Sequence, residues 1–215
     1  MNARPSRKPV WDLPLRLFHW ALALLVIAQV TTASIGGNAM EYHALGGYAI
    51  LALLLFRIAW GFVGGTHARF ADFVRGPATV LAYLRGRAGT FAGHNPLGGW
   101  SVTAMLASLL VQALTGLFAN DDVMMEGPLV KHVPGRFSEI ATAVHDANGW
   151  ILAGLALLHV LAVLFYLVVR RQNLIAPMLT GHKPDAPAPA HSGSVLRGGA
   201  ILAGAAAAVY FIVTF

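Results

Sequence analysis

Five apolar stretches of about twenty residues each constrain the fold of this chain more than any other feature. They cover residues 13–34, 43–63, 98–119, 144–169 and 196–215. A helix of about 20 residues is long enough to cross a hydrocarbon core about 30 Å thick, because each residue adds about 1.5 Å. The sequence therefore predicts an all-α integral membrane protein with five transmembrane helices.

The composition also favours a membrane protein over a soluble one. Hydrophobic residues make up 57% of the 215 residues and charged residues only 11%, whereas a typical soluble domain has about 25% charged residues. Since there is no cysteine, this chain cannot form a disulfide, hold an iron–sulfur cluster or attach haem covalently. The nine histidines are then the remaining nitrogen ligands for a metal.

Lys and Arg collect on one side of the predicted membrane. Twelve of them lie at or before the start of the first stretch, between the second and third, or after the fourth; only Lys131 and Arg136 lie in the opposite loops. The positive-inside rule then predicts a cytoplasmic N-terminus and a C-terminus on the outer side. These basic residues, which give the chain a net charge of +6, lie at the ends of the predicted helices, as membrane orientation requires. We therefore expect no nucleic-acid partner. The outer loop, residues 120–142, carries four acidic residues: Asp121, Asp122, Glu126 and Glu139.

Two other segments have distinctive patterns. In FADFVRGPATVLAYLRGR, residues 70–87, apolar and basic residues recur at helical spacing, which predicts one short helix lying in the membrane interface. The Pro- and Ala-rich HKPDAPAPAHSGS, residues 182–194, is typical of a linker. We therefore predict a membrane domain over residues 1–181, a linker over 182–195 and an additional transmembrane helix over 196–215. The small residues of this last stretch favour close packing on another helix.

Four histidines lie at two matched depths. His19 and His159 lie toward the cytoplasmic ends of their stretches, and His43 and His145 lie at the outer ends of theirs. His145 and His159 are 14 residues apart, which places them on nearly the same helix face and about 21 Å apart along the axis. Ionisable groups are costly inside a membrane, and imidazole is a common axial ligand of haem iron. We therefore predict two haems, one between His19 and His159 and one between His43 and His145.

Two arginines and one glutamine also require an explanation at membrane depth. Arg57 follows His43 by 14 residues, and Arg16 lies one turn before His19. A buried arginine requires an anionic partner, so both are candidates for binding haem propionates. Alternatives stay open: Arg57 snorkels to the interface, and Arg16 lies among lipid headgroups. Gln112 either forms a hydrogen bond to a neighbouring helix or lines a quinone pocket.

Several motifs resemble the bacterial cytochrome b561 family, which includes the b-type cytochrome subunit of membrane-bound nickel–iron hydrogenases. They are VWDLPLRLFHW, EYHALGGYAILALLLFRIAWGFVG, HARFADFVRGP, GHNPLGGW and HDANGWILAGLALLHVLAVLFY, in this order between about residues 10 and 182. The resemblance implies a bacterial inner-membrane protein, in which a four-helix transmembrane bundle holds two haem b groups. It also implies that His19, His43, His145 and His159 are the iron ligands. The fifth stretch lies outside this implied bundle.

Three functions stay open at this point. The resemblance implies an electron carrier between the quinone pool and a periplasmic redox protein such as a c-type cytochrome, for which the acidic outer loop is suited. The alternative is a stand-alone superoxide:quinone oxidoreductase, and the sign of the outer loop argues against it because superoxide is an anion. The sequence therefore does not decide between an electron-transfer subunit and an enzyme, and it shows no catalytic residue. A non-redox transporter is a third hypothesis, although no inverted repeat or interrupted helix pair is visible.

Overall fold

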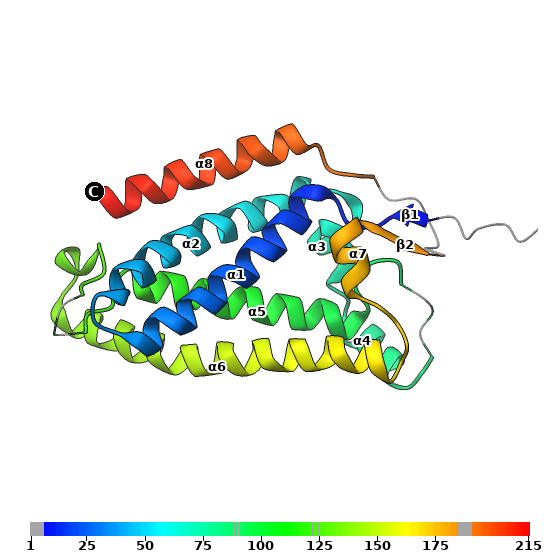
Figure 1. The fold of residues 1–215 in the computed structure, drawn as a ribbon, viewed down its shortest axis with the longest axis horizontal. Coiled ribbons are helices and arrows are strands. Elements are labelled where there is room, and N and C mark those ends of the chain that lie inside the picture. Colours follow the sequence, from blue (N-terminus) through cyan, green and yellow to red (C-terminus); the bar gives the residue numbers. More distant parts are fainter. Residues whose placement is uncertain (1–6, 88, 90, 122, 124, 185–190) are drawn as a thin grey trace, which may run out of the picture. The chain divides into compact units, whose positions relative to one another are not determined.

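The computed structural model describes residues 7–87, 89, 91–121, 123, 125–184 and 191–215; Asp122 and residues 185–190 of the predicted linker lie outside these residues. Within them, five helices are long and apolar enough to cross a membrane (Figure 1). These are α1 (Leu13–Ile35), α2 (Ala39–Val63), α5 (Pro96–Gly116), α6 (Gly135–Val168) and α8 (Val195–Thr214). The prediction of an all-α membrane protein with five spanning helices is confirmed.

Helix α6 begins earlier than the apolar pattern predicts. It has 34 residues, which corresponds to about 51 Å at about 1.5 Å per residue and exceeds a bilayer core of about 30 Å. Its first turns mix buried Ser138 and Ala141 with exposed Glu139 and Ile140. Polar residues interrupt the apolar pattern in these turns. The apolar stretch that the sequence shows therefore begins only at residue 144, nine residues after the helix itself begins.

The prediction of one interfacial helix over residues 70–87 is wrong, because the segment forms two short helices. They are α3 (Phe70–Phe73) and α4 (Pro77–Leu84). Gly76 between them is extended, with φ −63° and ψ 158°, and Pro77 is the first residue of α4. Proline has no backbone N–H and disfavours helical geometry in the residue before it, so the helix is interrupted here.

The remaining elements are short. They are β1 (Arg7–Pro9), η1 (Thr66–Ala68), η2 (Val130–His132), α7 (Ile175–Thr180) and β2 (His182–Pro184). Strands β1 and β2 pair antiparallel, with Lys8 opposite Lys183. The first residues of the predicted linker therefore belong to this strand pair.

The chain forms two compact units, each built from three segments. Unit 1 comprises Met1–Leu17, Arg57–Ala104 and Ala156–Gly199, and unit 2 comprises Phe18–Phe56, Met105–Leu155 and Ala200–Phe215. Unit 2 contains six of the nine acidic residues of the chain but only two of its fifteen Lys and Arg residues. The two units therefore carry opposite net charge.

Unit 1 is organised around a buried carboxylate. Asp12 is 6% exposed and caps α1 by accepting a hydrogen bond from the Leu15 backbone N–H, at 2.8 Å. It also accepts from the Gly65 N–H at 2.9 Å and from the Trp60 indole N–H at 3.2 Å. One side chain thus connects the start of α1 with the end of α2 and the residues that follow it.

Unit 2 has a core to which the C-terminal helix contributes. Val209 of α8 is buried against Leu51, Ala52 and Leu117, and Ala205 is also buried. A second buried cluster contains Ile50, Leu54 and Leu109. Helix α8 thus contacts unit 2 through Ala205 and Val209, whereas Gly204 is exposed, and close packing of its small residues stays a prediction.

Candidate haem site

His43 and His145 lie side by side in unit 2. His43 is near the N-terminal end of α2, and His145 lies on α6. Their ring centroids are 6.2 Å apart and their ring planes are inclined by 76°. Both side chains are partly buried, so the structure brings together two imidazoles that lie 102 positions apart in the sequence.

Hydrogen bonds assign the same tautomer to both rings. Nδ1 of His43 lies 3.2 Å from the carbonyl oxygen of Gln29, and Nδ1 of His145 lies 2.9 Å from that of Gln112. A carbonyl oxygen only accepts, so each Nδ1 carries the proton and donates it. Each Nε2 then has a lone pair, which is the arrangement that metal-ligating histidines adopt.

The spacing of the two rings fits one metal ion between them. A metal–imidazole bond is about 2 Å and each ring nitrogen lies about 1 Å from its ring centre, so two imidazoles on opposite sides of one ion have centres about 6 Å apart. The observed separation is 6.2 Å. His43 and His145 could therefore hold one haem iron between them, and the haem would supply one-electron redox chemistry there.

Gly116 contributes to this site, although the sequence analysis did not select it. A Cβ atom at this position would lie 3.0 Å from Cε1 and 3.3 Å from Nδ1 of His145. Such a contact would require the His145 ring to shift by a few tenths of an ångström. No sequence signal separates Gly116 from the other glycines of the membrane helices, because only the packing of α5 on α6 places it beside the imidazole.

Gln112 takes part in an interhelical network. Its side-chain oxygen accepts a hydrogen bond from Asn148 Nδ2 at 2.7 Å, and Asn148 Oδ1 accepts one from the Ser108 hydroxyl at 3.0 Å. Of the two interpretations of Gln112, the structure thus shows the hydrogen bond to a neighbouring helix. Asn148 lies one turn from His145 on α6 and fixes the register of α6 against α5.

The other two predicted ligands belong to different units. His19 lies in unit 2, with its ring 5.1 Å from the ring of Trp20 in an edge-on arrangement. His159 lies in unit 1, on α6. The pairing of His19 with His159 stays a prediction.

Arg57 is a buried cation of unit 1. It is 2% exposed, and its guanidinium carbon lies 5.0 Å from the centre of the Phe70 ring and 5.5 Å from that of Phe73. Within the described residues, its buried Nη1 has no hydrogen-bond partner. Because the guanidinium is buried, the structure argues against snorkelling.

Arg16 has partners that the sequence analysis did not consider. Its Nε donates to the carbonyl oxygen of Met178 at 3.3 Å and its Nη2 donates to that of Leu179. Both carbonyl groups belong to α7. Arg16 therefore ties the first turn of α1 to α7 within unit 1.

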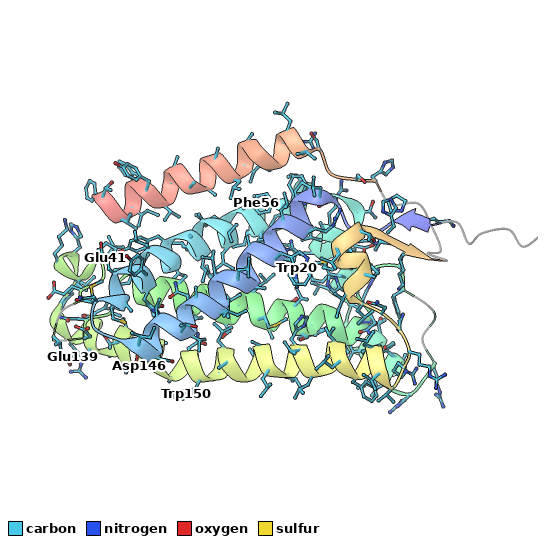
Figure 2. The ribbon with its side chains drawn as sticks, in the orientation of Figure 1. Trp20, Glu41, Phe56, Glu139, Asp146 and Trp150 are labelled. Carbon is cyan, nitrogen blue, oxygen red and sulfur yellow. The ribbon has the colours of Figure 1, made fainter. Side chains whose placement is uncertain are left out.

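Acidic side chains gather at one end of unit 2. Glu41, Glu139 and Asp146 lie together at this end, whereas Trp20 and Phe56 lie toward its other end (Figure 2). All three carboxylates are exposed, as are Asp121 and Glu126 of the predicted acidic loop. The acidic character predicted for the outer loop therefore extends to the nearby ends of α2 and α6.

Tyr83 of unit 1 has a raised pKa. The hydroxyl groups of Tyr83 and Tyr166 are 2.9 Å apart, and Asn95 Nδ2 donates to Tyr166 at 3.0 Å. Two effects raise the pKa of Tyr83 to about 12: the larger is burial of the phenol, and the second is the hydrogen bond to Tyr166. Tyr83 therefore stays protonated throughout the physiological range.

Comparison with known proteins agrees with these observations. The family model described as prokaryotic cytochrome b561 matches residues 10–181. The "Probable Ni/Fe-hydrogenase B-type cytochrome subunit" of Azotobacter vinelandii is 29% identical, and that of Azotobacter chroococcum mcd 1 is 27% identical; each alignment covers 83% of this chain and 90% of the relative. The subunit of the same name from Rhizobium leguminosarum bv. viciae is 23% identical, over 81% of this chain and 87% of the relative. The chain therefore belongs to the prokaryotic cytochrome b561 family of membrane proteins, which hold haem b and transfer electrons.

Proposed function

We propose that this protein is a di-haem membrane cytochrome that carries electrons between a periplasmic redox partner and membrane quinone. The observation that carries the proposal is the pair formed by His43 and His145, with matched tautomers and a ring separation of 6.2 Å. A haem held there supplies one-electron redox chemistry. The chain itself holds both imidazoles by their Nδ1–H groups and keeps Nε2 available for the iron.

We assign the second haem to His19 and His159. His159 follows His145 by 14 residues on the continuous helix α6, so the two imidazoles occupy one helix face about 21 Å apart along the axis. Arg57 is the proposed partner of a propionate, since its buried Nη1 has no partner in the described part of the chain. Arg16 is a second candidate for this role, alongside its contacts with α7.

The charge distribution supports an orientation and a type of partner. Twelve of the fifteen Lys and Arg residues lie at or before the start of α1, between α2 and α5 or after α6, so we assign these segments to the cytoplasmic side of the inner membrane. The N-terminus is then cytoplasmic and the C-terminus periplasmic. The exposed carboxylates of unit 2 are complementary in charge to a basic docking surface on a partner protein. The names of the relatives favour a Ni/Fe-hydrogenase as the partner, and a c-type cytochrome is the alternative that charge alone would allow.

The test is haem quantitation on purified protein with a reduced-minus-oxidised spectrum. Wild type should contain two haem b per chain. His43→Ala and His145→Ala should each lose one haem, and His19→Ala and His159→Ala should each lose the other. His132→Ala, which changes an exposed histidine of η2, should keep both.

Two results would contradict the assignment. If His43→Ala or His145→Ala keeps the wild-type haem content and spectrum, these residues are not the ligands. If quinol does not reduce the wild-type haems, the proposed exchange with quinone is wrong even where the ligands are right.

A further inference from the structure

The two imidazoles of unit 2 are held by the same three-residue pattern on two different helices. Gln29 and Thr32 on α1 face His43, and Gln112 and Thr115 on α5 face His145. The Thr32 hydroxyl oxygen lies 3.3 Å from Nδ1 of His43, and the Thr115 hydroxyl oxygen lies 3.3 Å from Nδ1 of His145. The spacing Gln-x-x-Thr is identical in both helices.

Each hydroxyl is oriented as an acceptor toward the ring. Thr32 donates its only hydroxyl proton to backbone carbonyls, that of Ala28 at 2.8 Å and more weakly that of Gln29 at 3.1 Å. Thr115 donates its proton in the same way to the carbonyls of Val111 at 2.7 Å and Gln112 at 3.2 Å. The lone pairs of each oxygen are then available to the imidazole N–H. Each Nδ1–H is therefore shared between a glutamine carbonyl and a threonine hydroxyl.

Acceptors at Nδ1–H increase the basicity of an imidazole as a metal ligand. A more basic ligand stabilises the oxidised iron more than the reduced iron. The glutamine carbonyls belong to the backbone, so no substitution removes them cleanly. The hydroxyls are the part of the pattern that evolution or mutagenesis can change without altering the ligands.

We propose that Thr32 and Thr115 are positioning residues that lower the reduction potential of the haem held by His43 and His145, each acting on one ligand to a similar extent. This inference rests on the proposed ligation by the two histidines. It adds that two equivalent acceptors, contributed by α1 and α5, lower the potential of this haem.

The experiment is a spectroelectrochemical redox titration of the purified holoprotein carrying Thr32→Val, Thr115→Val or both. Valine keeps the shape of the side chain and removes the acceptor. At a fixed potential near the midpoint of this haem, each single change should raise the ratio of reduced to oxidised haem about twofold to threefold, since a single hydrogen bond has a modest net free energy. The double variant should show the product of the two effects, and the other haem should keep its midpoint.

Two kinds of control separate tuning from structural damage. Thr31→Val removes a hydroxyl that is exposed and bonded to the Ile27 carbonyl at 2.8 Å, so it should leave both midpoints unchanged. Thr103→Val on α5, whose hydroxyl donates to the Gly99 carbonyl at 2.9 Å, should behave in the same way. Thr32→Ser and Thr115→Ser restore the acceptor and should restore the wild-type midpoint.

The outcomes distinguish the inference from the function on which it rests. Wild-type midpoints in both valine variants would overturn the inference, provided that His43→Ala and His145→Ala lose the haem. A shift in only one variant would also overturn it, because the two acceptors would not be equivalent. Haem retained at wild-type level in the histidine variants would instead overturn the proposed ligation.

Discussion

Replacing Asp12 tests whether one buried carboxylate holds unit 1 together. Its oxygen atoms cap α1 through the Leu15 N–H and accept from the Gly65 N–H and the Trp60 indole. Trp60 is fully buried and Asp12 is 6% exposed, so solvent has little access to replace these bonds. Asp12→Ala should therefore destabilise unit 1 strongly without changing any of the four predicted haem ligands.

The magnitude follows from the three donors. Loss of a helix N-cap costs about 1 kcal/mol, and each buried donor that loses its acceptor costs about 1–3 kcal/mol. With two such donors, Asp12→Ala should lower the free energy of unfolding by about 3–7 kcal/mol. Asp12→Asn keeps one acceptor oxygen but turns an amide donor toward N–H groups, so we expect a loss of about 1–3 kcal/mol.

Reversible unfolding in mixed detergent micelles, followed by circular dichroism, measures these differences. Glu139→Ala is the matched control, because it removes an exposed carboxylate and should change stability by less than about 0.5 kcal/mol. A loss below about 1 kcal/mol for Asp12→Ala would refute the reasoning. It would mean that water or another group replaces the carboxylate at these donors.

Two further predictions concern the haem site and the tyrosine pair. Gly116→Ala should reduce haem content or shift the spectrum of the haem beside His145, because the added Cβ would lie 3.0 Å from the ring. Gly154→Ala is the control and should do neither, because its added Cβ would meet nothing within 4 Å. Equal effects of both changes would show that the contact with His145 is not the cause. Tyr83 should ionise near pH 12 in an ultraviolet absorbance titration, and Tyr166→Phe should lower its pKa toward 10. Since the folded protein keeps this proton to a higher pH than the unfolded chain does, the associated stability is present below about pH 10 and is lost as the pH rises toward about 12. Ionisation of Tyr83 near pH 10 in the wild type would contradict the burial and hydrogen bonding described.

The membrane-spanning helices could be predicted from the sequence because, in a bilayer, the length and hydropathy of a segment are enough to indicate a helix. A chain that crosses it must satisfy its own backbone hydrogen bonds, so an apolar run of sufficient length forms a helix whatever its neighbours are. The ends were less predictable. Helix α6 extends beyond its apolar run because Ser138 and Ala141 find packing partners, and the break between α3 and α4 depends on a single proline, Pro77.

The residues that complete the candidate site depend on packing between helices. Gln29 and Gln112 meet the imidazoles through backbone carbonyl groups, which every residue has, so side-chain identity does not reveal them. Gly116 matters only because α5 lies against α6 at His145. Arg16 illustrates the same point, since its partners are two backbone carbonyls of α7, which lie 162 and 163 residues further along the chain.

The sequence by itself determined the class of protein, the number of spanning helices, the family and the histidines available as ligands, because hydropathy, length and residue chemistry are properties of the chain alone. Only the tertiary structure decided that His43 and His145 lie 6.2 Å apart with their Nδ1 atoms hydrogen-bonded. It also decided that Arg57 is buried against two phenylalanines and that α8 packs into the core of unit 2. These features depend on the register and rotation of each helix against its neighbours, and many side-chain contacts set them together.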